Sequence, residues 1–191
     1  GQQLEELMVQ PNLTKIVETL KMVKLEEKVL QLYPHELSGG MLQRVMIAMA
    51  FINQPKLIIA DEPFSALDAP LQVEMMQLIV DIANQNRTAT ILVTHQQELA
   101  YQFCTKVLTL EEGHFIEQEE ALQERIPFVR DTGVDTEVFF QLKNVSNHYQ
   151  SDDAILQSVT VDIPKYEVTG IMGHSGAGKT TLAKILSGFI P

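Results

Sequence analysis

The chain has 191 residues, of which 45% are hydrophobic and 20% charged, with a formal net charge of −11. This composition is typical of a globular protein with an apolar core. The longest apolar run, Val45 to Ile52, is far shorter than the ~20 residues of a membrane-spanning helix. No charged-then-apolar leader opens the sequence, so we expect no secretion signal. The acidic excess argues against a nucleic-acid surface, which needs clustered Lys and Arg.

Helical and strand-like patterns alternate through residues 1–118, where we expect one domain. In chain order we predict two helices, a buried strand, a helix and a second buried strand, over residues 2–32, 38–53, 56–60, 71–84 and 89–94. Strands that alternate with helices predict an α/β fold with a parallel sheet. Residues 107–116 then read as a hairpin, with turn residues at 111–113.

The second part of the chain has a different pattern of residues. Residues 119–136 are charged and contain Pro127 and Gly133, which predicts a linker. A second domain is expected over residues 137–191. In it, residues 138–145 and 154–163 alternate between apolar and polar, which predicts antiparallel strands. The continuous apolar run 168–172 predicts a buried strand, and a helix is predicted over residues 180–186.

A glycine-rich loop joins the last predicted strand to the last predicted helix. It reads Gly173-His174-Ser175-Gly176-Ala177-Gly178-Lys179-Thr180 and fits the pattern G-x-x-x-x-G-K-[ST] at every fixed position. Glycines let successive backbone N–H groups point at phosphate oxygens, and the helix dipole acts on the same anion. Lys179 then reaches the β- and γ-phosphates, and the Thr180 hydroxyl ligates Mg²⁺. A merely flexible Gly/Ser turn is the competing interpretation.

A second motif lies near the other end of the chain. Leu37-Ser38-Gly39-Gly40-Met41-Leu42-Gln43-Arg44 resembles the signature sequence of the ATP-binding cassette (ABC) ATPases, a P-loop NTPase family. In that family the serine and glycine N–H groups contact the γ-phosphate of ATP held by the opposite cassette. Ser38 and Gly40 are predicted at a helix start, where unpaired N–H groups bind anions. A plain helix N-cap with two turn glycines is the alternative.

The residues after this motif continue the resemblance. Leu57-Ile58-Ile59-Ala60-Asp61-Glu62-Pro63 is similar to the Walker B strand of the family, which implies that Asp61 holds Mg²⁺ and Glu62 polarises the attacking water. Ser65-Ala66-Leu67-Asp68 resembles the D-loop, and His95 matches the switch histidine. A surface acidic pair and a structural histidine are the competing interpretations.

The resemblance therefore implies ATP and Mg²⁺ as ligands. It makes Glu62 and His95 catalytic and assigns Mg²⁺ to Thr180 and Asp61. The ATP-binding residues that it implies are Tyr149, Gly173, Ser175, Gly176, Ala177, Gly178, Lys179, Thr180, Thr181, Ser38, Gly39, Gly40 and Asp68. Tyr149 is included because the family places an aromatic residue at about this distance before the loop, where it stacks on adenine.

The order of these motifs is reversed relative to an ABC cassette, in which the phosphate loop precedes the signature. Residues 1–118 are therefore interpreted as the later half of one cassette, with a helical subdomain, and residues 137–191 as the opening half of the next, with an antiparallel β subdomain. A circularly permuted single cassette is the alternative. In the two-cassette interpretation Ser38 and Lys179 are expected at one composite site, and Asp61, Glu62 and His95 at the other; in the permuted cassette Lys179, Asp61, Glu62 and His95 are expected around one nucleotide. The opening half of the second cassette could dock on the closing half of the first, and a phosphate loop far from Asp61 would exclude such docking.

The segment around the signature, Tyr33 to Ala50, looks like the peptide and nickel importer branch, although Phe64 departs from the threonine common there. The resemblance implies a transporter ATPase, peripheral on the cytoplasmic face of the membrane. Its expected partners are integral membrane subunits and a second cassette half, not nucleic acid. A cassette protein acting in DNA repair or on ribosomes, and a regulatory cassette without catalysis, are the alternatives. No residue is assignable as the family's glutamine loop, so we expect the chain alone to hydrolyse ATP poorly.

Overall fold

The computed structural model describes residues 12–116, 137–148 and 154–190. The predicted linker and Tyr149 lie outside these residues. The chain forms two compact units. We call residues 1–56 and 66–86 the helical unit, and residues 57–65 and 87–191 the sheet unit. Within the described residues, no helix has the length and apolarity needed to cross a membrane.

The helical unit is built from three α-helices and two short 3-10 turns among the described residues. In chain order these are α2 (Leu13–Met22), η1 (Glu27–Gln31), η2 (Pro34–Glu36), α3 (Gly39–Phe51) and α4 (Ala69–Asn86). Helix α3 contacts both α2 and α4. Arg44 connects α3 to the rest of the helical unit. Its guanidinium donates a hydrogen bond to the Val23 carbonyl at 2.9 Å and forms an ion pair with Glu74 of α4.

The single helix predicted over residues 2–32 is wrong for the described part of that range, where α2 ends at Met22. Lys24 adopts a left-handed backbone with φ of 57°. The N–H groups of Lys24 and Leu25 then turn back to the carbonyls of Lys21 and Leu20, at 3.0 and 2.9 Å. This is a Schellman ending, and it brings Leu25 into the core beside Leu20. The apolar spacing continues past Met22, although the helix does not.

The sheet unit contains a five-stranded sheet in the order β1-β2-β7-β3-β4. Its strands are β1 (Leu57–Asp61), β2 (Ala89–Val93), β3 (Lys106–Glu111), β4 (His114–Ile116) and β7 (Val168–Met172). The first four strands in this order are parallel, and β3 and β4 form the predicted hairpin. Strands β5 (Val138–His148) and β6 (Ala154–Pro164) form a separate antiparallel pair.

Strand β7, from the end of the chain, lies between two strands from its first part. Ile91 of β2 pairs with Thr169 on one side, and Val107 of β3 pairs with Gly170 on the other. The parallel core sheet therefore contains strands from both sides of the predicted linker, which is the docked arrangement that the sequence analysis described. The phosphate loop that follows β7 begins at the carboxyl edge of this sheet.

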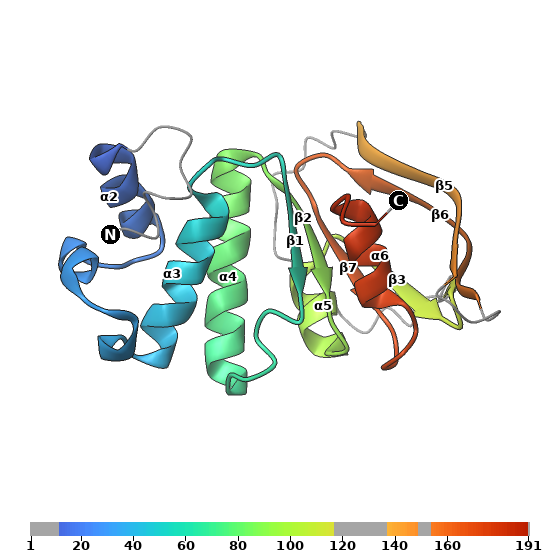
Figure 1. Cartoon of the computed structure of the whole chain (residues 1–191), viewed down its shortest axis with the longest axis horizontal. Coiled ribbons are helices and arrows are strands. Elements are labelled where there is room, and N and C mark those ends of the chain that lie inside the picture. Colours follow the sequence, from blue (N-terminus) through green and yellow to red (C-terminus); the bar gives the residue numbers. More distant parts are fainter. Residues whose placement is uncertain (1–11, 117–136, 149–153, 191) are drawn as a thin grey trace. The chain divides into compact units, whose positions relative to one another are not determined.

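Strand β7 is packed on both faces of the sheet. Helix α6 (Lys179–Leu186) and the β5–β6 pair lie on one face of the sheet (Figure 1). They share an apolar cluster with the strands of that sheet. On the other face, α5 (Gln97–Phe103) contacts β7. Strand β7 is buried along its whole length, as a central parallel strand should be. The predicted mixed α/β fold, with a parallel core sheet and an antiparallel pair, is confirmed.

Candidate functional site

The glycine-rich loop between β7 and α6 is shaped by three left-handed or otherwise positive-φ glycines. Gly173, Gly176 and Gly178 have φ of 156°, 85° and 97°. A Cβ atom on Gly173 would lie 2.2 Å from the Leu110 carbonyl oxygen, so the loop passes directly against β3. Gly178 is the N-cap of α6, which directs the free N–H groups of that helix toward the loop. The residue types and the geometry both suit a bound phosphate.

Lys179 is held inside this loop by two backbone oxygens. Its Nζ donates to the carbonyls of Gly173 and His174, at 2.9 and 3.0 Å. A lysine in the first turn of a helix normally extends into solvent, where it keeps its rotamer freedom. Here the hydrogen bonds fix the ammonium group over the loop, so that its charge is already oriented toward an anion that the loop amides bind.

The acidic pair at the end of β1, Asp61 and Glu62, is fixed by an unusual backbone conformation at Glu62. Glu62 has φ of 46°, a left-handed value that costs roughly 1–3 kcal/mol outside glycine. Its N–H donates to the Val93 carbonyl at 2.9 Å, which attaches the turn to the end of β2. The Glu62 carboxylate accepts hydrogen bonds from the backbone N–H and the Nδ1 of His95, at 3.1 and 2.8 Å. The two residues expected to be catalytic are therefore in direct contact.

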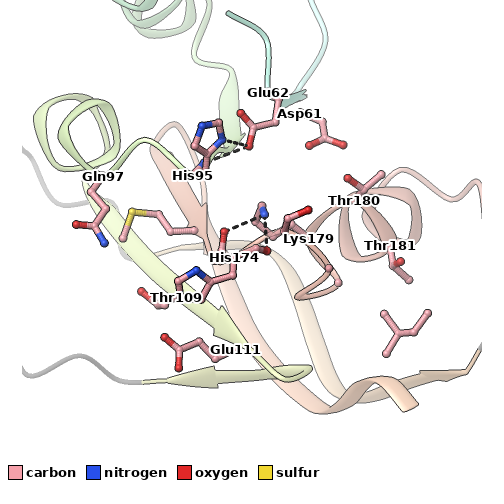
Figure 2. Close-up of a pocket in the computed structure, with 16 residues that line it drawn as sticks. Asp61, Glu62, His95, Gln97, Thr109, Glu111, His174, Lys179, Thr180 and Thr181 are labelled. Carbon is pink, nitrogen blue, oxygen red and sulfur yellow. Dashed lines mark hydrogen bonds and ion pairs between the residues drawn. The ribbon is translucent and has the colours of Figure 1, made fainter. Parts of the chain in front are cut away.

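The glycine-rich loop, the acidic pair and His95 line one pocket of about 900 Å³, within the size range of small-molecule sites. Figure 2 shows Asp61, Glu62 and His95 on one side of Lys179, and Thr109 and Glu111 on the other. The lining residues are Asp61, Glu62, His95, Gln97, Thr109, Glu111, Ile155, Met172, Gly173, His174, Ser175, Gly176, Gly178, Lys179, Thr180 and Thr181. All of them belong to the sheet unit.

The donor atoms in this pocket suit Mg²⁺ only if a ligand contributes further oxygens. Asp61 and Thr180 supply a carboxylate and a hydroxyl, both hard oxygen donors of the kind that Mg²⁺ prefers. Among the described residues, no group of three or more His, Cys, Asp or Glu side chains is arranged to hold a metal. Mg²⁺ bound through one or two protein oxygens and the oxygens of a phosphate fits this pocket.

Several expected site residues lie elsewhere. Ser38, Gly39, Gly40 and Asp68 belong to the helical unit and do not line the pocket. Ser38 is the N-cap of α3, and its hydroxyl accepts from the Met41 N–H at 3.3 Å. The Asp68 carboxylate accepts from the Leu71 N–H at 3.0 Å, at the start of α4. Both therefore cap helices, and their expected contacts with ATP stay predictions, as does that of Tyr149. Ala177, within the loop, is buried and does not line the pocket.

Six residues of the pocket were given no role in the sequence analysis: Gln97, Thr109, Glu111, Ile155, Met172 and His174. Met172 and His174 lie in the predicted strand and in the glycine-rich loop, but no function was expected of them. Thr109 and Glu111 were assigned to a hairpin and given no role. Glu111 ends β3, which pairs directly with β7, so its position at the carboxyl edge of a parallel sheet was the available signal. Gln97 begins the short helix α5, which was not predicted. Ile155 belongs to β6, whose packing depends on the tertiary fold.

Comparison with known proteins gives relatives among transport ATP-binding proteins. The chain is 33% identical over 195 residues to the peptidoglycan transport ATP-binding protein YejF of Agrobacterium fabrum, covering 86% of this chain and 35% of that protein. It is 34% identical over 185 residues to the uncharacterized ABC transporter ATP-binding protein MJ1242 of Methanocaldococcus jannaschii, covering 90% and 34%. It is 43% identical over 130 residues to the oligopeptide transport ATP-binding protein OppD of Escherichia coli, covering 63% and 39%. The chain thus spans little more than a third of the length of these relatives.

The family model described as ABC transporter matches residues 3–65 and 156–191, together just over half of the chain. The first stretch includes the signature-like motif and the acidic pair, and the second includes the phosphate loop. These are the segments on which the resemblance was based, and the second contributes the strand that completes the parallel sheet. The chain belongs to the ABC transporter family.

Proposed function

We propose that the pocket of the sheet unit binds Mg²⁺–ATP, and that the whole protein uses ATP hydrolysis to drive transport. The observation that carries this proposal is the convergence of Lys179 with Asp61, Glu62 and His95 on one pocket. Loop amides and a fixed ammonium group recognise phosphate, and a carboxylate–imidazole pair beside them can act on water. The family to which the chain belongs supports the same activity.

In this proposal each side chain has a distinct role. Lys179 and the N–H groups of the loop bind the β- and γ-phosphates, and Thr181 follows them in the first turn of α6. Asp61 and Thr180 would hold Mg²⁺, which supplies charge neutralisation for the phosphates when bound. Glu62 orients and polarises the attacking water, and His95 positions the Glu62 carboxylate through the 2.8 Å hydrogen bond. Ile155 provides an apolar wall suited to the base or ribose.

Nucleotide binding to the 191-residue chain tests the proposal directly. We expect Lys179→Ala to weaken Mg²⁺–ATP binding about 10- to 100-fold, because a charge-assisted hydrogen bond contributes roughly 1.5–3 kcal/mol. Lys184→Ala is the matched control, since Lys184 lies in the last turn of the same helix, is exposed and does not line the pocket. Calorimetric titration that gives equal affinities for the two variants would refute the proposed role of the loop.

We further infer that the chain joins two cassettes, with residues 1–118 ending the first and residues 137–191 opening the second. A single alignment with YejF covers 86% of this chain within 35% of that protein, which supports the same motif order inside one longer polypeptide. On this inference the whole protein binds two nucleotides, with Lys179 at one site and Asp61, Glu62 and His95 at the other, whereas in the 191-residue chain the four residues share a single pocket that binds one nucleotide. A measured stoichiometry of one in the whole protein would favour the permuted cassette instead.

The proposed cargo is a peptide or a related small solute, and the proposed partners are integral membrane subunits at the cytoplasmic face. The names of YejF and OppD, which refer to peptidoglycan and oligopeptide transport, support this choice. Co-purification of the whole protein from detergent-solubilised membranes tests the partner class. Recovery of ribosomes or DNA in place of integral membrane proteins would overturn it.

A further inference from the structure

Glu111 is a charged residue of the nucleotide pocket to which the proposed reaction gives no role. It ends β3, and the carbonyl oxygen of the preceding residue, Leu110, lies only 2.2 Å from the position that a Cβ atom on Gly173 would occupy. The backbone of Glu111 is therefore fixed beside the first glycine of the phosphate loop. Its side chain is half-buried and lines the pocket.

Within the described part of the chain, no direct contact neutralises the charge of Glu111. No ion pair or side-chain hydrogen bond joins its carboxylate to any described residue. By contrast, the Glu62 carboxylate accepts two hydrogen bonds from His95, and Asp61 is a donor for the proposed Mg²⁺. In Figure 2 Glu111 lies on the far side of Lys179 from both of these residues, so it is not adjacent to the proposed metal donors.

We propose that Glu111 is a specificity-determining residue, which selects the cation-bound nucleotide by repelling the cation-free form. This inference deepens the proposed function and rests on it. A divalent cation cancels about half of the negative charge of a triphosphate, so the repulsion from Glu111 is about twice as strong for free ATP as for Mg²⁺–ATP. The single Lys179 among the lining residues leaves this repulsion only partly offset.

Coulomb's law sets the size of the effect. For unit charges about 10 Å apart in water, each pair changes the binding constant roughly twofold. Removal of the Glu111 charge should then tighten the binding of free ATP on the order of tenfold at low salt, and that of Mg²⁺–ATP about fourfold. At physiological ionic strength, with a Debye length of about 8 Å, both changes should fall below about threefold.

The experiment compares Glu111→Gln with Glu112→Gln in the full 191-residue chain. Both substitutions remove one negative charge and keep the size of the side chain. Glu112 is the adjacent residue, but it is exposed in the turn and does not line the pocket. ATP is titrated calorimetrically in EDTA and in excess Mg²⁺, at low and at physiological salt. Glu111→Asp serves as a third variant that keeps the charge.

We expect Glu111→Gln to narrow the affinity ratio between Mg²⁺–ATP and free ATP more than Glu112→Gln does, and Glu111→Asp to leave the ratio near the wild-type value. The ratio is measured within one protein, so a partly unfolded variant does not distort it. Equal ratios in Glu111→Gln and Glu112→Gln, or loss of selectivity in Glu111→Asp, would overturn the role of Glu111 alone. If the wild-type chain binds ATP in neither condition, the proposed function fails, and this inference fails with it.

Discussion

Gly173 is the position at which the sheet and the phosphate loop constrain each other most directly. Its φ of 156° disfavours any other residue, and an added Cβ would meet the Leu110 carbonyl oxygen at 2.2 Å and the Ala177 Cβ at 3.3 Å. The first contact is with backbone of a paired strand, which cannot rotate away as a side chain can. Gly173→Ala must therefore displace the loop or separate the ends of β7 and β3.

Gly176 provides a matched position in the same loop. Its φ of 85° is also positive, but a Cβ there would meet nothing within 4 Å. Gly176→Ala should thus cost only the backbone strain, about 1–2 kcal/mol. Gly173→Ala should add an overpacking cost of about 1–3 kcal/mol, for a total of roughly 2–5 kcal/mol. Both variants share the stabilisation that arises when an unfolded chain loses a glycine, so this contribution cancels in the comparison.

Urea unfolding followed by far-ultraviolet circular dichroism measures this difference, since the chain has no tryptophan for fluorescence. We expect the free energy of unfolding to fall more for Gly173→Ala than for Gly176→Ala, by about 1–3 kcal/mol, with similar m-values. Equal destabilisation of the two variants would show that contact with β3 does not constrain the loop, and the packing argument would then be wrong.

Two further predictions concern other parts of the molecule. Arg44→Met should destabilise the chain by about 1.5–3 kcal/mol in thermal unfolding, because it removes a charge-assisted bond to the Val23 carbonyl from a side chain that is only 14% exposed. Glu74→Gln, which affects only the 53%-exposed partner, should cost less than about 1 kcal/mol, and the reverse order would contradict the argument. In the whole protein, Glu62→Gln should slow ATP hydrolysis about 10²–10⁴-fold while ATP still binds. Unchanged turnover in a phosphate-release assay would instead support a regulatory cassette.

Much of the fold was predictable because its signals are local. Strands β2 and β7 are continuous apolar runs and are buried as predicted. Strand β1 is also an apolar run, but the prediction that it is buried on both faces is wrong, because it lies at the edge of the sheet and is only half-buried. Helix α3 begins at Gly39, directly after its predicted capping residue Ser38. The end of α2 was not predictable from apolar spacing, because Leu25 fits the helical period and is buried by a chain reversal at Lys24 instead. Helix α5 has only seven residues, too few to show a clear period.

The residues of the pocket likewise fall into two groups: those that local sequence motifs indicate, and those that only the tertiary fold places there. Lys179, Asp61, Glu62 and His95 occur in motifs whose residue types and spacing indicate phosphate chemistry. Glu111 has no such motif, and its place in the pocket depends on which strand lies beside β7. Strand order is a property of the tertiary structure, and in this chain β7 pairs with strands far from it in sequence. Thr109 and Glu111, which line the pocket through strand order alone, were therefore missed.

The central position of β7 also governs how the sheet unit acquires its structure during synthesis. Strands β2 and β3 are translated first, but they have no direct pairing with each other, and β7 begins only at Val168. Until β7 leaves the ribosome, β2 and β3 each lack the strand that pairs with one of their edges. Adding β7 between them then requires contacts between residues far apart in the sequence, and such contacts slow folding. For the 191-residue chain expressed by itself, chaperone association is therefore expected to be greatest for nascent chains that stop just before Val168.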